Sequence, residues 1–162
     1  MLNIECKSNM ISKEEIEKCI NSLLGKKYLA LDINIKVYKS KYELWKDIIL
    51  GRASNCGKIS GNFNSFTDEI KIYIFNIKIK NISILRLQIL YNILHEIRHN
   101  YQKYYCSKKF NLDCNNYINI GSNYDKQWIE IDANRTARII MNKRKDIINK
   151  ILDIEDNSWF IA

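Results

Sequence analysis

The stretch Leu94-His95-Glu96-Ile97-Arg98-His99-Asn100 contains a His-Glu-x-x-His motif inside a run with the pattern of a helix. Residues four apart project from one face of a helix, so His95 and His99 can bind the same ion. Glu96 follows the first histidine and is placed to act on water activated by that ion rather than to bind the ion. The chain has two histidines, and both lie in this motif. The spacing therefore indicates a zinc helix rather than an exposed face with two chance histidines.

Length and composition are those of one globular domain spanning residues 1–162. The hydrophobic fraction of 46% and the charged fraction of 27% are typical of soluble proteins. No apolar run approaches the roughly 18 residues of a membrane span, and Met1–Lys7 lacks the basic and apolar regions of a signal peptide. We therefore expect a cytoplasmic protein with no membrane partner.

The formal net charge of +8 raises the alternative of nucleic-acid binding. Lysine, isoleucine, asparagine and tyrosine are all frequent while proline is absent, a bias typical of low-G+C genomes. The basic residues are spread along the chain except for Lys143–Lys145, which we place on a solvated helix face or at a helix break. Nucleic acid is therefore possible as a partner but is not favoured over a protein or peptide substrate.

The five cysteines form no Cys-x-x-Cys pair. In a reducing compartment they are expected to act as small hydrophobes or unpaired thiols. A second metal site that uses Cys106 and Cys114 stays open as a minor alternative.

The first half of the chain, residues 1–80, has a helix–strand–helix–strand pattern. Ser12 and Glu15 form a capping box that predicts a helix ending at Gly25. Strict alternation of apolar and polar residues predicts a half-buried strand over Leu29–Val37. The stretch Ser40–Gly51 repeats the capping box and the terminal glycine, so it predicts a second helix. Its apolar residues are Leu44, Trp45, Ile48 and Ile49.

A further strand is predicted around Ile70–Phe75. The alternation slips at Ile74 and resumes at Ile77, so the strand stops near Asn76 or carries a bulge there. Phe63–Asp68 has the residues of a turn that joins two antiparallel strands. An open edge near Ile70–Phe75 could bind an extended peptide by strand addition.

The second half, residues 81–162, is expected to carry the active-site helices. The motif helix begins at Asn81 or Ser83, either of which can cap it, and runs to about Tyr104 or Tyr105. Cys106–Tyr124 is polar with little periodicity and is expected to be a loop or flap at the site. A last helical region starts near Asp125. Together the two halves predict an α+β fold in a single domain.

A hydrolytic zinc needs three protein ligands and one open position for water. Because no histidine remains outside the motif, the third ligand must be a carboxylate, which excludes the metzincin layout with its third histidine. Thermolysin-like enzymes instead take a glutamate from a second, later helix. The segment Trp128–Ala137 is the candidate for that helix, and the alternative is a plain amphipathic helix with surface acids.

Within this segment, Glu130 shares one helix face with Ala133, Asn134, Ala137 and Met141. The two alanines would let this helix approach the motif helix closely, and Asn134 could hydrogen-bond a zinc-bound histidine. Asp132 is rotated roughly 200° from Glu130, at about 100° per residue, so both cannot easily bind one metal from a regular helix. We favour Glu130 as the third ligand, and Asp132 stays as the alternative ligand.

The motif His95-Glu96-x-x-His99, followed by Glu130-x-x-Ala133-Asn134 and then Ala137, resembles the gluzincin-type ImmA/IrrE family and related small zinc peptidases of phages and mobile elements. The resemblance implies a minimal zincin-like domain in which a small mixed or antiparallel sheet packs on helices. It also implies a zinc-dependent endopeptidase with one Zn²⁺ held by the two histidines and Glu130, and with Glu96 as base. Two positions depart from the family pattern, because arginine occupies positions 98 and 135.

The reaction expected is hydrolysis of a peptide bond in a protein substrate, for example a repressor. Zinc lowers the pKa of its water toward about 7, and Glu96 takes the proton and later delivers it to the leaving amine. The oxyanion needs a further donor, for which the candidates are Arg98, Tyr101, Tyr117 and Tyr124. Two alternatives come from other classes: a catalytically silent zinc-binding sensor or interaction module, and a basic nucleic-acid-binding protein with an incidental histidine pair.

Overall fold

Four short strands form one mixed sheet in this computed structural model, which describes residues 1–51, 59–116 and 126–161. The strands are β1 (Leu2–Cys6), β2 (Ile33–Tyr38), β3 (Gly61–Asn64) and β4 (Glu69–Tyr73). The helices are α1 (Lys13–Leu23), α2 (Lys26–Leu29), α3 (Lys41–Ile49), α4 (Ile82–Tyr105), α5 (Ser107–Asn115), α6 (Trp128–Lys143) and α7 (Lys145–Leu152). The α+β class is therefore confirmed.

The sheet has the strand order β1-β2-β4-β3, in which β1, β2 and β4 are parallel and β3 pairs antiparallel with β4. Ile4, Ile35 and Ile70 lie opposite one another across the three parallel strands, and all three are buried. Side chains alternate between the two faces of a strand, so Val37 and Ile72 belong to the same apolar face. This face of the sheet forms one side of the hydrophobic core.

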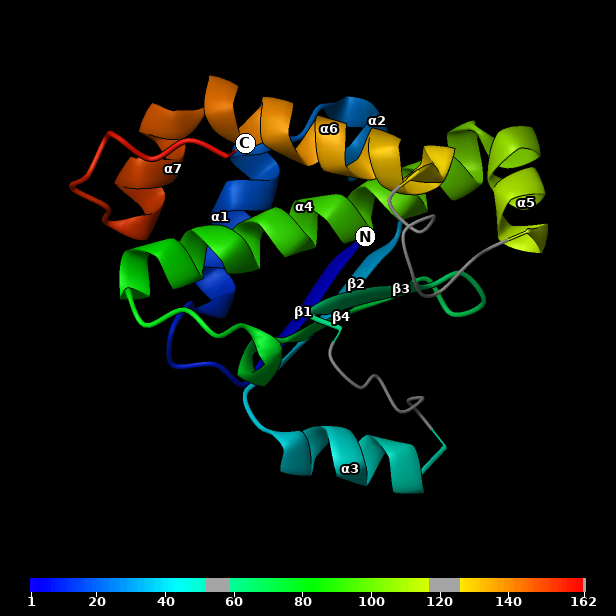
Figure 1. Ribbon diagram of the computed structural model, residues 1–162, viewed down its shortest axis with the longest axis horizontal. Helices are drawn as coiled ribbons and strands as arrows, with labels where there is room; N and C mark the ends of the chain where they lie inside the picture. The colour runs from blue at the N-terminus through cyan, green and yellow to red at the C-terminus, as the bar shows by residue number, and fades with distance from the viewer. Residues whose placement is uncertain (52–58, 117–125, 162) are drawn as a thin grey trace.

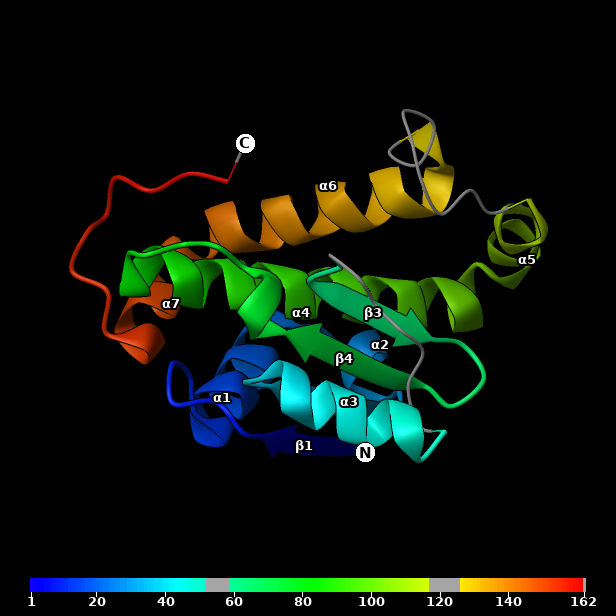
Figure 2. The ribbon, with the colours of Figure 1, turned by 60° about the horizontal axis from the view of Figure 1, so that its bottom comes forward.

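The long helix α4 lies across the sheet, and α6 lies on the side of α4 away from the sheet, while α3 lies beyond the opposite sheet face (Figures 1 and 2). The Asn81 side chain caps α4 by accepting a hydrogen bond of 3.0 Å from the Ile84 N–H. Because α4 is covered on two sides, several of its polar residues are buried beside its apolar stripe. These residues are Asn92, Glu96, His99, Asn100 and Gln102.

The start of the chain differs from the sequence prediction. Leu2–Cys6 forms β1, a strand that the sequence analysis did not propose, although Leu2, Ile4 and Cys6 alternate with polar residues. The strand predicted over Leu29–Val37 is wrong at its beginning, because Lys26–Leu29 forms the short helix α2. Pairing with β1 and β4 begins the second strand at Ile33 instead.

Both predicted capping boxes are present, at the starts of α1 and α3. Gly51 has a left-handed φ of +66° just after α3, a conformation that glycine adopts without strain. Of the apolar residues of α3, Leu44 alone is buried. Trp45 and Ile49 are 60% and 77% exposed.

The slip in alternation after Ile72 has a structural cause. Strand β4 ends at Tyr73, and a single 3₁₀ turn follows over Ile74–Asn76. Of the two alternatives, a stop and a bulge, the structure has the stop, although it comes three residues before Asn76. No strand resumes at Ile77. The turn between β3 and β4 connects antiparallel strands as predicted. The sequence left open whether the edge near Ile70–Phe75 is free, and the structure shows that it is not, because β4 pairs on both sides and β3 covers that edge of the described sheet.

The second half contains more helix than the sequence predicted. The bounds of α4 agree with the prediction, but much of the expected loop Cys106–Tyr124 is helix α5. Residues 117–124 of that loop, and the proposed cap Asp125, lie outside the described residues. Of the two placements considered for Lys143–Lys145, a solvated helix face and a helix break, the structure has the break, because α6 ends at Lys143 and α7 begins at Lys145. In the three described stretches, none of the helices has the length and hydropathy needed to span a bilayer.

The capping box of α1 contacts α4 through an ion pair, which allows a test of its contribution to the stability of the fold. The Glu15 carboxylate accepts a hydrogen bond of 2.8 Å from the Ser12 N–H and pairs with Arg86. Burial raises the pKa of Glu15, but the Ser12 N–H and Arg86 outweigh it, so the pKa lies below its ordinary value. We expect Glu15→Gln to lower the free energy of unfolding by about 1 kcal/mol near neutral pH.

A lowered pKa stabilises the fold above the pKa of the unfolded chain, and the effect is lost as pH falls through the folded value. The difference between wild type and Glu15→Gln should therefore shrink on acidification, as followed by urea unfolding monitored by circular dichroism. The exposed Glu17→Gln on the same helix is the matched control and should change little. Equal effects of the two substitutions would contradict the prediction.

Candidate metal centre

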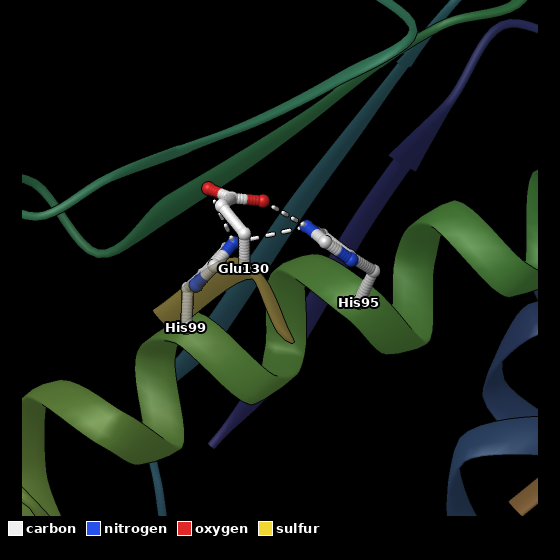
Figure 3. A group of neighbouring side chains, drawn as sticks. All are labelled: His95, His99 and Glu130. Carbon is white, nitrogen blue, oxygen red and sulfur yellow. Dashed lines mark hydrogen bonds and ion pairs between the residues drawn. The ribbon is translucent and has the colours of Figure 1, made fainter. Parts of the chain in front are cut away.

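His95, His99 and Glu130 meet between α4 and α6, as the close-up in Figure 3 shows. One ligand atom from each residue lies within 4.8 Å of the others. The two histidines are four residues apart on α4, and Glu130 comes from the first turn of α6. Residues separated by about 30 positions in the chain thus form one cluster.

The separations of the donor atoms agree with those of a tetrahedral zinc site. Two donors about 2.0–2.1 Å from a zinc ion, at a tetrahedral angle, lie about 3.3 Å apart. The two histidine Nε2 atoms are 3.0 Å apart. The Glu130 carboxylate oxygens lie 3.3 Å from His95 Nε2 and 3.6 Å from His99 Nε2. Two imidazole nitrogens and one carboxylate are also the ligand set of hydrolytic zinc enzymes.

Close packing of α6 on α4 brings Glu130 to the histidines. Ala133 and Ala137 are fully buried, so the two helices approach without intervening side chains, as the sequence predicted. Glu130 is only 2% exposed. Burial raises the pKa of Glu130, but hydrogen bonds from the two histidines outweigh it and hold that pKa far below its ordinary value. An ionised, buried carboxylate is well suited to bind a cation.

The pKa of His99 is shifted in the opposite direction to that of Glu130. Burial lowers the pKa of His99, but the hydrogen bond to Glu130 and the nearby Glu96 outweigh burial and raise that pKa. A cation among the three side chains would take the place of the proton that this arrangement favours.

Glu96 is buried beside the cluster but is not one of its three members. Its carboxylate lies against strand β3, where a Cβ added at Gly61 would come within 2.6 Å of Glu96 Oε1. Glycine at position 61 is thus what allows the strand to approach this carboxylate. Burial raises the pKa of Glu96 and outweighs the histidines and the Phe63 backbone N–H, which lower it. A carboxylate with a raised pKa is a stronger base.

Asp132, the alternative ligand, lies outside the cluster. It accepts hydrogen bonds from Arg98 Nε at 2.7 Å and Nη2 at 3.2 Å, and a third from Gln102 Nε2 at 2.7 Å. Of the two acids, the structure therefore places Glu130 and not Asp132 with the histidines. The helix rotation that separates the two side chains is the one expected from their spacing.

Asn134 does not contact a histidine as the sequence analysis expected. Its Oδ1 accepts a hydrogen bond of 2.6 Å from the Tyr91 hydroxyl, which forms a second contact between α4 and α6 one turn away from the cluster. The histidine contact is made instead by Gln102, whose Oε1 lies 2.9 Å from His99 Nδ1. Sequence reasoning missed Gln102, although it lies three residues after His99 on the same helix.

The oxyanion candidates of the sequence analysis have other partners where they are described. Arg98 pairs with Asp132 and donates to the Tyr28 hydroxyl, and Tyr101 stacks on Tyr28 with ring centroids 4.4 Å apart. Tyr117 and Tyr124 lie outside the described residues.

Metal analysis by mass spectrometry tests the cluster directly. We expect about one zinc per chain after loading, and loss of the metal in His99→Ala and Glu130→Ala. Asp132→Ala should still bind zinc at saturating concentration, because its carboxylate is directed at Arg98 and Gln102. Zinc lost from Asp132→Ala but kept by Glu130→Ala would reverse the assignment of the third ligand.

Comparison of the chain with protein-family models, with curated proteins and with solved structures gave no match in any of the three.

Proposed function

We propose that this protein is a zinc-dependent endopeptidase with a zincin-like domain, of the gluzincin type that the motifs resemble. The observation that supports this best is the convergence of two imidazole nitrogens and one carboxylate at separations of 3.0, 3.3 and 3.6 Å. His95, His99 and Glu130 would hold the metal. A zinc ion, when bound, supplies a Lewis acid and lowers the pKa of water to about 7.

Glu96 is the proton carrier in this proposal. It lies next to His95 in sequence, is buried, and has no part in the ligand cluster. Its raised pKa favours uptake of a proton from the attacking water. The same carboxyl group then gives that proton to the nitrogen of the leaving amine, so that the base is regenerated in each turnover.

Strand β3 is the proposed binding edge for substrate. It is one of the two outer strands of the described sheet and runs antiparallel to β4, and its Gly61 lies against Glu96. An extended peptide that adds to this edge would pair through its own backbone groups and present its scissile bond near Glu96. Backbone pairing of this kind favours a protein or peptide substrate over a nucleic acid.

Glu96→Gln tests the proposed chemistry. The amide is nearly isosteric but cannot take a proton, so we expect hydrolysis of a quenched fluorescent peptide mixture to fall by at least about 100-fold. Zinc content and melting temperature should stay close to those of wild type. Wild-type protein that binds zinc but cleaves none of a broad peptide mixture or unfolded casein would support the alternative of a silent zinc-binding module instead.

Gly61→Ala tests the contact between β3 and the proposed base. The added Cβ must displace the Glu96 carboxylate, and a displacement near 1 Å can cost on the order of 100-fold in rate. We expect kcat to fall while zinc stays bound, because no metal ligand is touched. Gly25→Ala is the matched control, since nothing lies within 4 Å of a Cβ at that position. Unchanged hydrolysis in Gly61→Ala would contradict the proposed place of Glu96.

A further inference from the structure

A chain of hydrogen bonds leads from His99 away from the metal cluster. His99 Nδ1 lies 2.9 Å from Gln102 Oε1. Gln102 Nε2 in turn lies 3.0 Å from the Ile129 carbonyl oxygen and 2.7 Å from Asp132 Oδ2. Asp132 is held by Arg98 through two contacts of 2.7 and 3.2 Å. Gln102 is fully buried, so water does not compete for these partners.

The partners of Gln102 determine which way its amide points. A backbone carbonyl oxygen such as that of Ile129 can only accept hydrogen bonds. Asp132 forms an ion pair with Arg98 through contacts of 2.7 and 3.2 Å, and a carboxylate paired in this way also only accepts hydrogen bonds. The NH₂ group of Gln102 must therefore face these two acceptors. Its oxygen is left facing His99.

The orientation of Gln102 in turn selects the tautomer of His99. An amide oxygen accepts a hydrogen bond, so His99 Nδ1 must carry a proton to donate to it. In the neutral imidazole the lone pair then lies on Nε2. Nε2 is the atom that faces His95 and Glu130. The chain of contacts thus leaves the correct nitrogen free to bind a metal.

Gln102 also contacts the helix that carries the third ligand. Ile129 precedes Glu130, and its carbonyl oxygen accepts from Gln102 while its N–H donates to Asp113 Oδ2 of α5 at 3.1 Å. The residue before Glu130 is therefore held from two sides. One buried amide connects the His99 ring with the backbone next to Glu130.

The other histidine has no such support among the described residues, where His95 Nδ1 is buried without a hydrogen-bond partner. The asymmetry makes His99 the ligand whose ring is fixed before a metal arrives. Ordering a ring in advance removes part of the entropy cost of binding.

We propose that Gln102 is the positioning residue of the metal centre, with Asp132 and Arg98 acting through it. It holds His99 with Nε2 toward the metal and at the same time fixes the backbone beside Glu130. This inference rests on the proposed zinc function. It assigns Asp132 a role other than metal ligand. It also assigns Arg98, the residue that departs from the family motif, a role other than oxyanion donor.

The test is the zinc affinity of Gln102→Met, measured by competition with a chromophoric chelator. Methionine has a similar shape but accepts and donates none of these hydrogen bonds, and loss of such a contact typically weakens metal binding 10- to 100-fold. Gln88→Met places the same substitution on α4, where Gln88 contacts Asn92 and no residue of the cluster. We expect this control to bind zinc as wild type does.

Gln102→Glu tests whether the NH₂ group of Gln102 is needed, because glutamate keeps an oxygen that can face His99 but lacks that donor. The carboxylate still accepts from His99, but its second oxygen meets the Ile129 carbonyl and Asp132, so we expect weaker binding again. Wild-type affinity in either variant at position 102 would overturn the inference. Wild-type protein that binds no zinc would overturn the proposed function instead, which keeps the two failures distinct.

Long-range ¹H–¹⁵N NMR of the zinc-loaded wild type gives a readout that depends on no variant. The inference requires His99 to bind through Nε2 with a proton on Nδ1. Coordination of His99 through Nδ1, or a deprotonated Nδ1, would overturn it even if the variants at position 102 fail to fold.

Discussion

The close contact between α4 and α6 is the constraint on which the candidate site depends. Neither helix by itself contains all three donor residues. Because a glutamate side chain spans only a few ångströms, the two helices must lie close together for the donors to meet. Ala133 and Ala137 are fully buried at the contact, so the axes of the helices come close enough for Glu130 to reach both histidines. A larger residue at either alanine would separate the helices and with them the donor atoms. Packing of small residues therefore sets how close the three donor groups lie.

The same contact concentrates buried polar groups, which are costly unless paired. Glu96, His99, Gln102 and Glu130 are all buried. Their partners come from different elements: β3 lies against Glu96, and α6 supplies the acceptors for Gln102. The ion pair of Arg98 with Asp132 fixes the outer end of the network. Removing one member leaves its neighbours unpaired, so this network orders the site as well as stabilising it.

Local signals in the sequence predicted the elements that local interactions form. The capping boxes at Ser12 and Ser40 and the cap at Asn81 mark the starts of three helices, because each involves residues three positions apart. The predictions of secondary structure were wrong where contacts between segments far apart in the chain determine the structure. Leu29 alternates with its neighbours as in a strand, yet β-pairing begins only at Ile33. Ser107–Asn115 has weak periodicity, and α5 is supported by contact with α4 and α6.

The sequence by itself determined that His95 and His99 share one helix face and that Glu96 does not bind with them, since helical geometry depends only on spacing. It also limited the third member of the candidate site to an acid on a later helix. Only the tertiary structure placed Glu130, and not Asp132, beside the histidines, and only it revealed Gln102, Gly61 and the outer position of β3. The physical reason is that the rotation of α6 against α4 and the pairing of β3 are set by packing between segments far apart in the chain. No local pattern encodes which side chains meet there.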